Sequence, residues 1–83
     1  MKLEDVLTER ERSHGDFGDN ARLAQAMKEL FRREEGWKRL SSGQKEALDM
    51  IAHKIGRILS GDCNERDHWF DVAGYAQLVV LEL

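Results

Sequence analysis

The sequence contains no proline and only one cysteine, Cys63. A single cysteine excludes a disulfide within the chain, and an unpaired thiol is typical of a reducing compartment. The start, Met1-Lys2-Leu3-Glu4-Asp5, turns acidic at once, which is not the pattern of a signal peptide. The best apolar run covers only residues 78–81, far below the roughly 20 residues of a membrane span. We therefore expect a soluble, cytoplasmic protein without a membrane partner.

The chain also lacks an excess of basic charge. It carries 13 Lys and Arg residues against 16 Asp and Glu residues, for a net charge of -3. Proteins that bind DNA or RNA usually concentrate basic charge on one face. A long nucleic acid is therefore not an expected partner, whereas a few focused cations can still hold a small anion.

A chain of 83 residues has room for one domain, residues 1–83, with a thin core. A domain of this size buries roughly 60–65% of the surface that its unfolded chain exposes. Small domains usually compensate with disulfides, metals or partner subunits. Because disulfides are excluded, we expect a homo-oligomer.

The spacing of apolar residues predicts four helices and no strands, which indicates an all-α, compact bundle. Asp19 or Asn20 is expected to cap the second helix. Ser41 and Gln44 form a capping-box pattern at the start of the third, and Gly61 is placed to end it. The expected helices cover about residues 2–12, 20–36, 41–61 and 64 or 65 to the end of the chain.

The fourth helix has two apolar sides. One is a continuous stripe of Trp69, Val72, Ala73, Ala76, Val80 and Leu83. The other carries Phe70, Leu78 and Leu81. A helix that is apolar nearly all round must be covered nearly all round, which three neighbours in so small a domain cannot do. We therefore expect the second side to pair across a twofold axis, in a dimer or a higher closed form.

The third helix has a polar side opposite its apolar stripe. Helical projection places Glu46, His53 and Arg57 on it, with Asp49 on one flank and Lys54 on the other. Lys54 and Arg57 are three residues apart and can converge on one anion, as a point charge and a rigid fork that both suit phosphate. The alternative is an ordinary solvated face.

The loop from His14 to Gly18 joins the first two helices. Its two glycines would let backbone N–H groups approach a ligand, with Asp16 beside it. Phe17 is expected either to stack on a base or to tie the loop to the core. Neither His14 nor His68 has a partner at zinc-site spacing, so no structural zinc is expected. The candidate ligand-binding residues are Asp16, Phe17, His53, Lys54, Arg57, Trp69, Asp71 and Tyr75.

Four carboxylates on the third and fourth helices suggest an alternative, metal-assisted chemistry. Magnesium prefers hard oxygen ligands and is commonly shared with substrate phosphates. Asp67 can instead cap the fourth helix from its third position, behind Asn64 as N-cap. Gly74, in the middle of that helix, indicates close approach of a backbone or a ligand. The candidate metal ligands are Glu46, Asp49, Asp67 and Asp71.

Three segments carry a resemblance to a known family. They are residues 11–17 (ERSHGDF), 47–62 (ALDMIAHKIGRILSGD) and 67–76 (DHWFDVAGYA). Together they resemble a family of small uncharacterised all-α proteins encoded by tailed phages and prophages. The layout is more distantly similar to the nucleotide-modification-associated and MazG-like all-α families, which cleave nucleoside triphosphates with helix-borne carboxylates and magnesium.

The resemblance and the cation pair lead to one hypothesis and two alternatives. The hypothesis is a phage-type protein that holds a small phosphorylated nucleotide, linear or cyclic, without a cofactor, and sequesters it in counter-defence in the host cytoplasm. Small helical, oligomeric phage proteins include such sponges, a comparison by size and architecture only. One alternative is a MazG-like, magnesium-dependent nucleoside triphosphate pyrophosphohydrolase. The other is a protein-interaction module.

Overall fold

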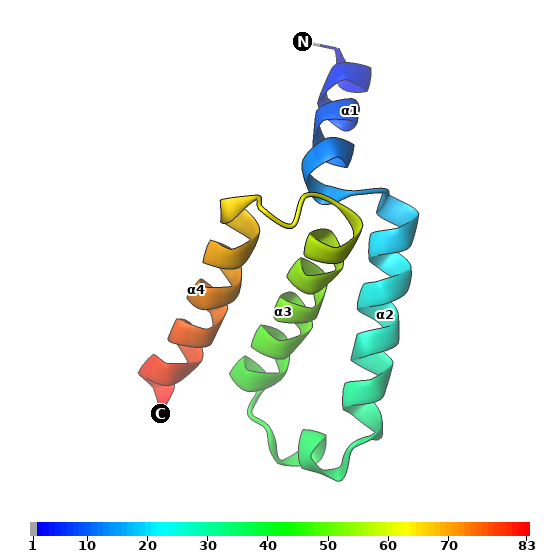
Figure 1. Cartoon of the computed structure of the whole chain (residues 1–83). Helices are drawn as coiled ribbons and strands as arrows, with labels where there is room; N and C mark the ends of the chain where they lie inside the picture. Colours follow the sequence, from blue (N-terminus) through cyan, green and yellow to red (C-terminus); the bar gives the residue numbers. More distant parts are fainter. Residues whose placement is uncertain (1) are drawn as a thin grey trace.

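The computed structural model describes residues 2–83 and is all-helical over that range, without strands (Figure 1). It is a bundle of four α-helices, as expected, with one short 3-10 helix, η1, between the second and the third. The elements are α1 (Leu3–His14), α2 (Phe17–Arg33), η1 (Glu35–Arg39), α3 (Ser42–Ser60) and α4 (Arg66–Glu82).

The capping box of α3 is confirmed. The Gln44 N–H donates to Ser41 Oγ at 3.1 Å, and the Ser41 N–H donates to Gln44 Oε1 at 2.8 Å. Gly61 is the C-cap. The clearest helix of the sequence therefore begins and ends where its local signals placed it.

The predicted start of α2 was wrong. The cap is Asp16, whose Oδ2 accepts a hydrogen bond from the Asp19 N–H at 3.1 Å. Gly15 turns the chain just before it, with φ 82°. The helix therefore starts at Phe17, earlier than Asn20. At α4 the N-cap is Glu65, without a side-chain cap bond.

The helices form a layer with α3 in the middle (Figure 1). α2 and α4 pack on opposite flanks of α3, and α1 projects beyond one end of the layer without a buried residue. Contacts between neighbours rely on small residues. A Cβ on Gly56 would collide with the Asn20 side chain, so this glycine lets α2 approach α3 closely.

Of the stripe that begins at Trp69, only Val72 lies on the side of α4 that packs on α3. His68 is buried, and Val72, Tyr75 and Val79 continue the same side as half-buried residues. Trp69 of the stripe is exposed, and so are Phe70 and Leu78 of the second apolar side. The reason is that a helix at the edge of a layer has a single neighbour, so both of its apolar sides remain open.

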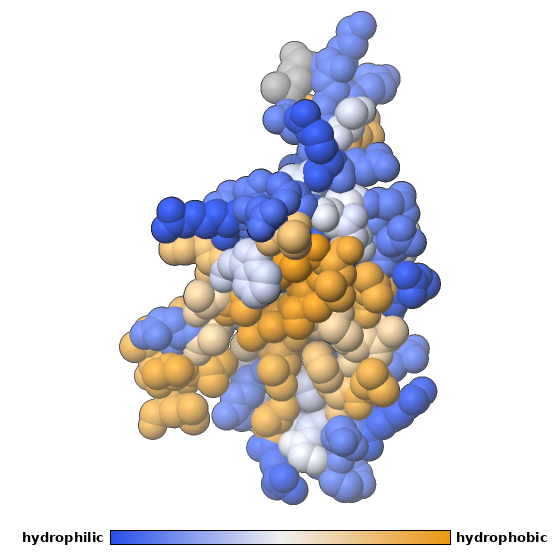
Figure 2. All heavy atoms as spheres, viewed as in Figure 1, coloured by the Kyte–Doolittle hydropathy of each residue, from blue (hydrophilic) through white to orange (hydrophobic). Residues whose placement is uncertain are grey.

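α3 shows two different faces between its neighbours. Helical spacing places Leu48, Ile51, Ile55 and Leu59 on one open face, and Glu46, Met50, His53 and Arg57 on the other. Figure 2 shows apolar side chains gathered over the middle of the layer on one side of the molecule. No helix within residues 2–83 is long and apolar enough to cross a membrane.

Candidate functional site

A hollow of about 380 Å³ lies where the loop between α1 and α2 meets the polar face of α3. We call it the junction hollow. Four of the candidate ligand-binding residues meet there, namely Asp16, Phe17, His53 and Arg57. Phe17 is 80% exposed, so it does not tie the loop to the core. The other lining residues are Leu7, Arg10, Glu11, His14, Gly15 and Asn20.

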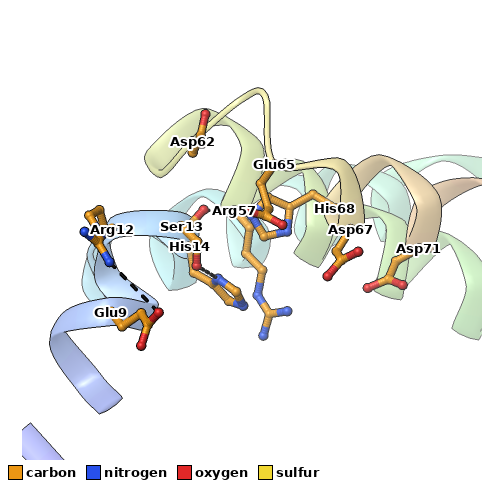
Figure 3. A pocket seen from close by; sticks show the side chains of 10 residues that line it. All are labelled: Glu9, Arg12, Ser13, His14, Arg57, Asp62, Glu65, Asp67, His68 and Asp71. Carbon is orange, nitrogen blue, oxygen red and sulfur yellow. Dashed lines mark hydrogen bonds and ion pairs between the residues drawn. The ribbon is translucent and has the colours of Figure 1, made fainter. Parts of the chain in front are cut away.

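A second hollow, of about 520 Å³, opens on the other side of His14 and Arg57, which line both (Figure 3). We call it the acidic hollow because five carboxylates surround it. Asp67 and Asp71 extend into it from α4, and Arg12 pairs with Glu9 at its rim, at 4.0 Å. Its acids are Glu9, Asp62, Glu65, Asp67 and Asp71.

Arg57 is the cation that both hollows share. Its Nε is buried and has no hydrogen-bond partner within residues 2–83, and its guanidinium makes no ion pair with any described carboxylate. Figure 3 shows this guanidinium reaching past His14 into the open space. A fork of donors held this way is suited to an anion from outside the chain.

His68 positions the loop, a role that the sequence analysis missed. It is 2% exposed, and its Nε2 lies 2.8 Å from the Ser13 carbonyl oxygen. Because a carbonyl only accepts, Nε2 must carry the hydrogen. The Asp62 N–H donates to the same oxygen at 3.1 Å. The spacing of the sequence could have indicated that His68 is buried, since residues 68, 72, 75 and 79 fall on one side of the helix.

His14 packs against His68. Its ring meets the His68 ring edge-on, with centroids 4.8 Å apart, and its Nδ1 lies 2.6 Å from Ser13 Oγ. A Cβ on the next residue, Gly15, would collide with the backbone of Ser60, so glycine lets the chain lie close to the end of α3. The end of α1 is thus fixed to the end of α3, and this places His14 beside Arg57.

Lys54 lies apart from Arg57. Its Nζ is 2.9 Å from Asp71 Oδ2, and its side chain is only 10% exposed. The hydrogen bond from Lys54 lowers the pKa of Asp71 below its ordinary value. Lys54 lines neither hollow. The flank of α3 that carries it faces α4, whereas Arg57 lies on the open face, so the two cations of the expected pair do not converge.

The candidate metal ligands are dispersed. Asp49 accepts two hydrogen bonds from Arg32, at 3.1 and 2.7 Å, on the opposite flank of α3. Glu46 is exposed, whereas Asp67 and Asp71 line the acidic hollow. Among the described residues, no three His, Cys, Asp or Glu side chains are grouped so that they could hold a metal ion.

The remaining candidates lie on α4, away from the junction hollow. Trp69 donates its Nε1–H to the Cys63 carbonyl at 2.8 Å and so closes the turn before α4. Tyr75 is half-buried beside Asp71. A Cβ on Gly74 would meet no described atom within 4 Å, so the structure shows no close approach at this glycine.

Two histidines of the junction hollow have lowered pKa values. Burial is the main cause for both His14 and His53, followed by the positive charge of Arg57. Smaller lowering effects on these pKa values come from Lys54, from His68 and Arg10 at His14, and from Lys28 and His14 at His53. The neutral form of both imidazoles is therefore favoured, first by burial and then by the charge of Arg57.

The lowered pKa values of these two histidines predict that the free energy of unfolding depends on pH. The unfolded histidines titrate near pH 6.5, above the lowered pKa values of the folded chain. Below that pH the unfolded state binds more protons, so the free energy of unfolding should fall as the pH drops from 7.5 to 5.5. Urea unfolding at pH 7.5 and at pH 5.5 measures this change in the free energy of unfolding. Replacement of His14 and His53 by Gln should reduce the dependence of that free energy on pH. An unchanged slope in that double variant would contradict the assignment.

Comparison with known proteins places the chain in a family. A family model described as "Domain of unknown function (DUF6378)" matches residues 3–80. Because this match covers nearly the whole chain, the protein belongs to that family. No curated protein and no solved structure gives a significant match.

Proposed function

We propose that this family member binds a small phosphorylated nucleotide in the junction hollow. The observation that carries the proposal is the arrangement around Arg57. An unpaired guanidinium, two neutral imidazoles and an exposed phenyl ring line one hollow of about 380 Å³. Ligand pockets of roughly 300–1,000 Å³ combine apolar walls with a few convergent polar groups in the same way.

Two parts of the lining suit a nucleotide, and they lie beside the carboxylates of Glu11 and Asp16. Arg57 would hold the phosphate through its fork of donors, supported by ring N–H groups of His14 and His53. Phe17 and Leu7 offer the apolar surface on which a base would stack.

Binding without turnover is the better supported mode. Two of the four carboxylates expected to hold magnesium, Asp49 and Asp71, are already paired with Arg32 and Lys54. Because a cation already neutralises each of these two carboxylates, they are less available to bind the magnesium that cleavage would need. We therefore propose that the protein holds its nucleotide, whether linear or cyclic, and that a phage-encoded chain would sequester it in the host cytoplasm.

Isothermal calorimetry with a panel of linear and cyclic nucleotides tests this proposal. We expect saturable binding, one nucleotide per chain, that persists in EDTA. Phe17→Ala should weaken binding about 5- to 150-fold, since stacking on an aromatic ring contributes roughly 1–3 kcal/mol per base. Release of pyrophosphate from a nucleoside triphosphate with magnesium would favour the enzyme instead. No heat across the whole panel, with or without magnesium, would leave only a protein-interaction module.

A further inference from the structure

The single chain has almost no core of large side chains. Within residues 2–83, the buried apolar residues are three alanines and Ile58. Burial of large apolar side chains is the dominant favourable contribution to folding, and alanines contribute little to it. A stable fold of this chain therefore needs apolar surface from outside. The three alanines are Ala24, Ala47 and Ala52.

The exposed apolar surface forms one continuous face of the layer, here called the apolar face. A groove of about 320 Å³ between α3 and α4 lies within it, lined by Leu48, Ile51, Ala76 and Val79 among others. Helical spacing extends the face across all three helices of the layer, and none of its members is charged. It comprises Leu23, Met27, Leu30, Leu48, Ile51, Ile55, Leu59, Trp69, Ala76, Val80 and Leu83.

The extent of this face fits a stable interface. Six of its large side chains are exposed, including Leu59, Trp69 and Val80. Together with their half-buried neighbours they provide area on the order of the roughly 800 Å² that each partner buries in a standard interface. Monomeric soluble proteins rarely expose a contiguous apolar patch of that size.

We propose that the occupant of the apolar face is the same face of a second copy of this chain. A surface that completes the core is needed whenever the chain folds, and the one partner always present in equal amount is another copy. Two layers stacked about a twofold axis bury both faces at once, with side chains of each copy in the α3–α4 groove of the other. This inference does not depend on nucleotide binding.

The stacking has a consequence for the site. His53 and Arg57 lie on the opposite open face of α3, so the two junction hollows would face outward on opposite sides of the dimer. Each would be complete within one chain. The patch of Phe70, Leu78 and Leu81 also lies outside the seam, unlike the twofold contact expected from the sequence.

Two adjacent residues of α4 provide a matched test. Val80 lies on the apolar face and is 60% exposed, whereas Leu81 points away from it and is 72% exposed. Sedimentation equilibrium at micromolar concentration should give twice the chain mass of 9.6 kDa for the natural protein and for Leu81→Glu. Val80→Glu should give the single-chain mass or an unfolded chain.

The natural protein supplies a second measurement, which does not require that Val80→Glu folds. Because folding and association are coupled, the Tm should rise with protein concentration. A natural chain that sediments as a monomer, with a Tm independent of concentration, would overturn the proposal. So would a dimer that Leu81→Glu dissociates and Val80→Glu leaves intact.

Discussion

Replacing Gly15 with alanine is expected to lower the free energy of unfolding by about 3 kcal/mol, a large part of the stability of so small a domain. Two effects act in the same direction. The backbone at Gly15 has φ 82° and ψ -178°, a region that is essentially restricted to glycine and costs other residues about 1–3 kcal/mol. An added Cβ would also collide with the backbone of Ser60, which cannot rotate away as a side chain can.

Gly18, in the same loop motif, is the matched control. It lies in the first turn of α2, and its added Cβ would meet only Asp16 Oδ2, the tip of a side chain, at 3.1 Å. Gly18→Ala should therefore change the free energy of unfolding by less than about 1 kcal/mol. Urea titrations of both variants measure the difference. Equal effects of the two substitutions would mean that the loop is not held against α3.

The local signals of the sequence were sufficient for the elements themselves. The capping box at Ser41 and the end of α3 at Gly61 depend on residues within one turn of each other, so their pattern carries the information. The start of α2 was misplaced because three short polar residues, Asp16, Asp19 and Asn20, can each cap a helix. Only the turn at Gly15 decides among them.

Tertiary contacts account for what the sequence could not supply. Helical projection correctly separated the polar side of α3 from its flanks, but it could not say which helix each flank meets. Lys54 faces α4 and pairs with Asp71, and Asp49 faces α2 and pairs with Arg32. Arg57, three residues from Lys54, remains on the open face, so one member of the expected cation pair lines the hollow and the other does not.

His68 is a second residue whose tertiary partner could not be predicted from the sequence. A histidine among apolar residues gives no sign of its partner, and Ser13, which accepts its hydrogen bond, is 55 residues away in the sequence. The loop motif was recognised from its glycines and its aromatic residue. Its position beside His53 and Arg57 follows only from the anchor that His68 and Asp62 provide at the Ser13 carbonyl.

Replacing Arg57 with methionine should weaken nucleotide binding by about 10- to 150-fold, the second large effect we expect. Hydrogen bonds to a charged group contribute about 1.5–3 kcal/mol, and Arg57 is the guanidinium at the centre of the junction hollow. Methionine keeps much of the side-chain volume, so the fold should persist. Because Arg57 lowers the pKa of both His14 and His53, its loss should also raise those pKa values.

Calorimetry with the tightest ligand of the panel measures the change in Kd, and NMR titration of the ring protons measures the histidine pKa values. Arg33→Met is the control, since Arg33 is exposed in the last turn of α2 and lines neither hollow. Arg57→Lys should bind with intermediate affinity because a point charge replaces the fork. A raised histidine pKa in Arg57→Met with unchanged nucleotide affinity would confirm the local electrostatics and remove Arg57 from the binding site.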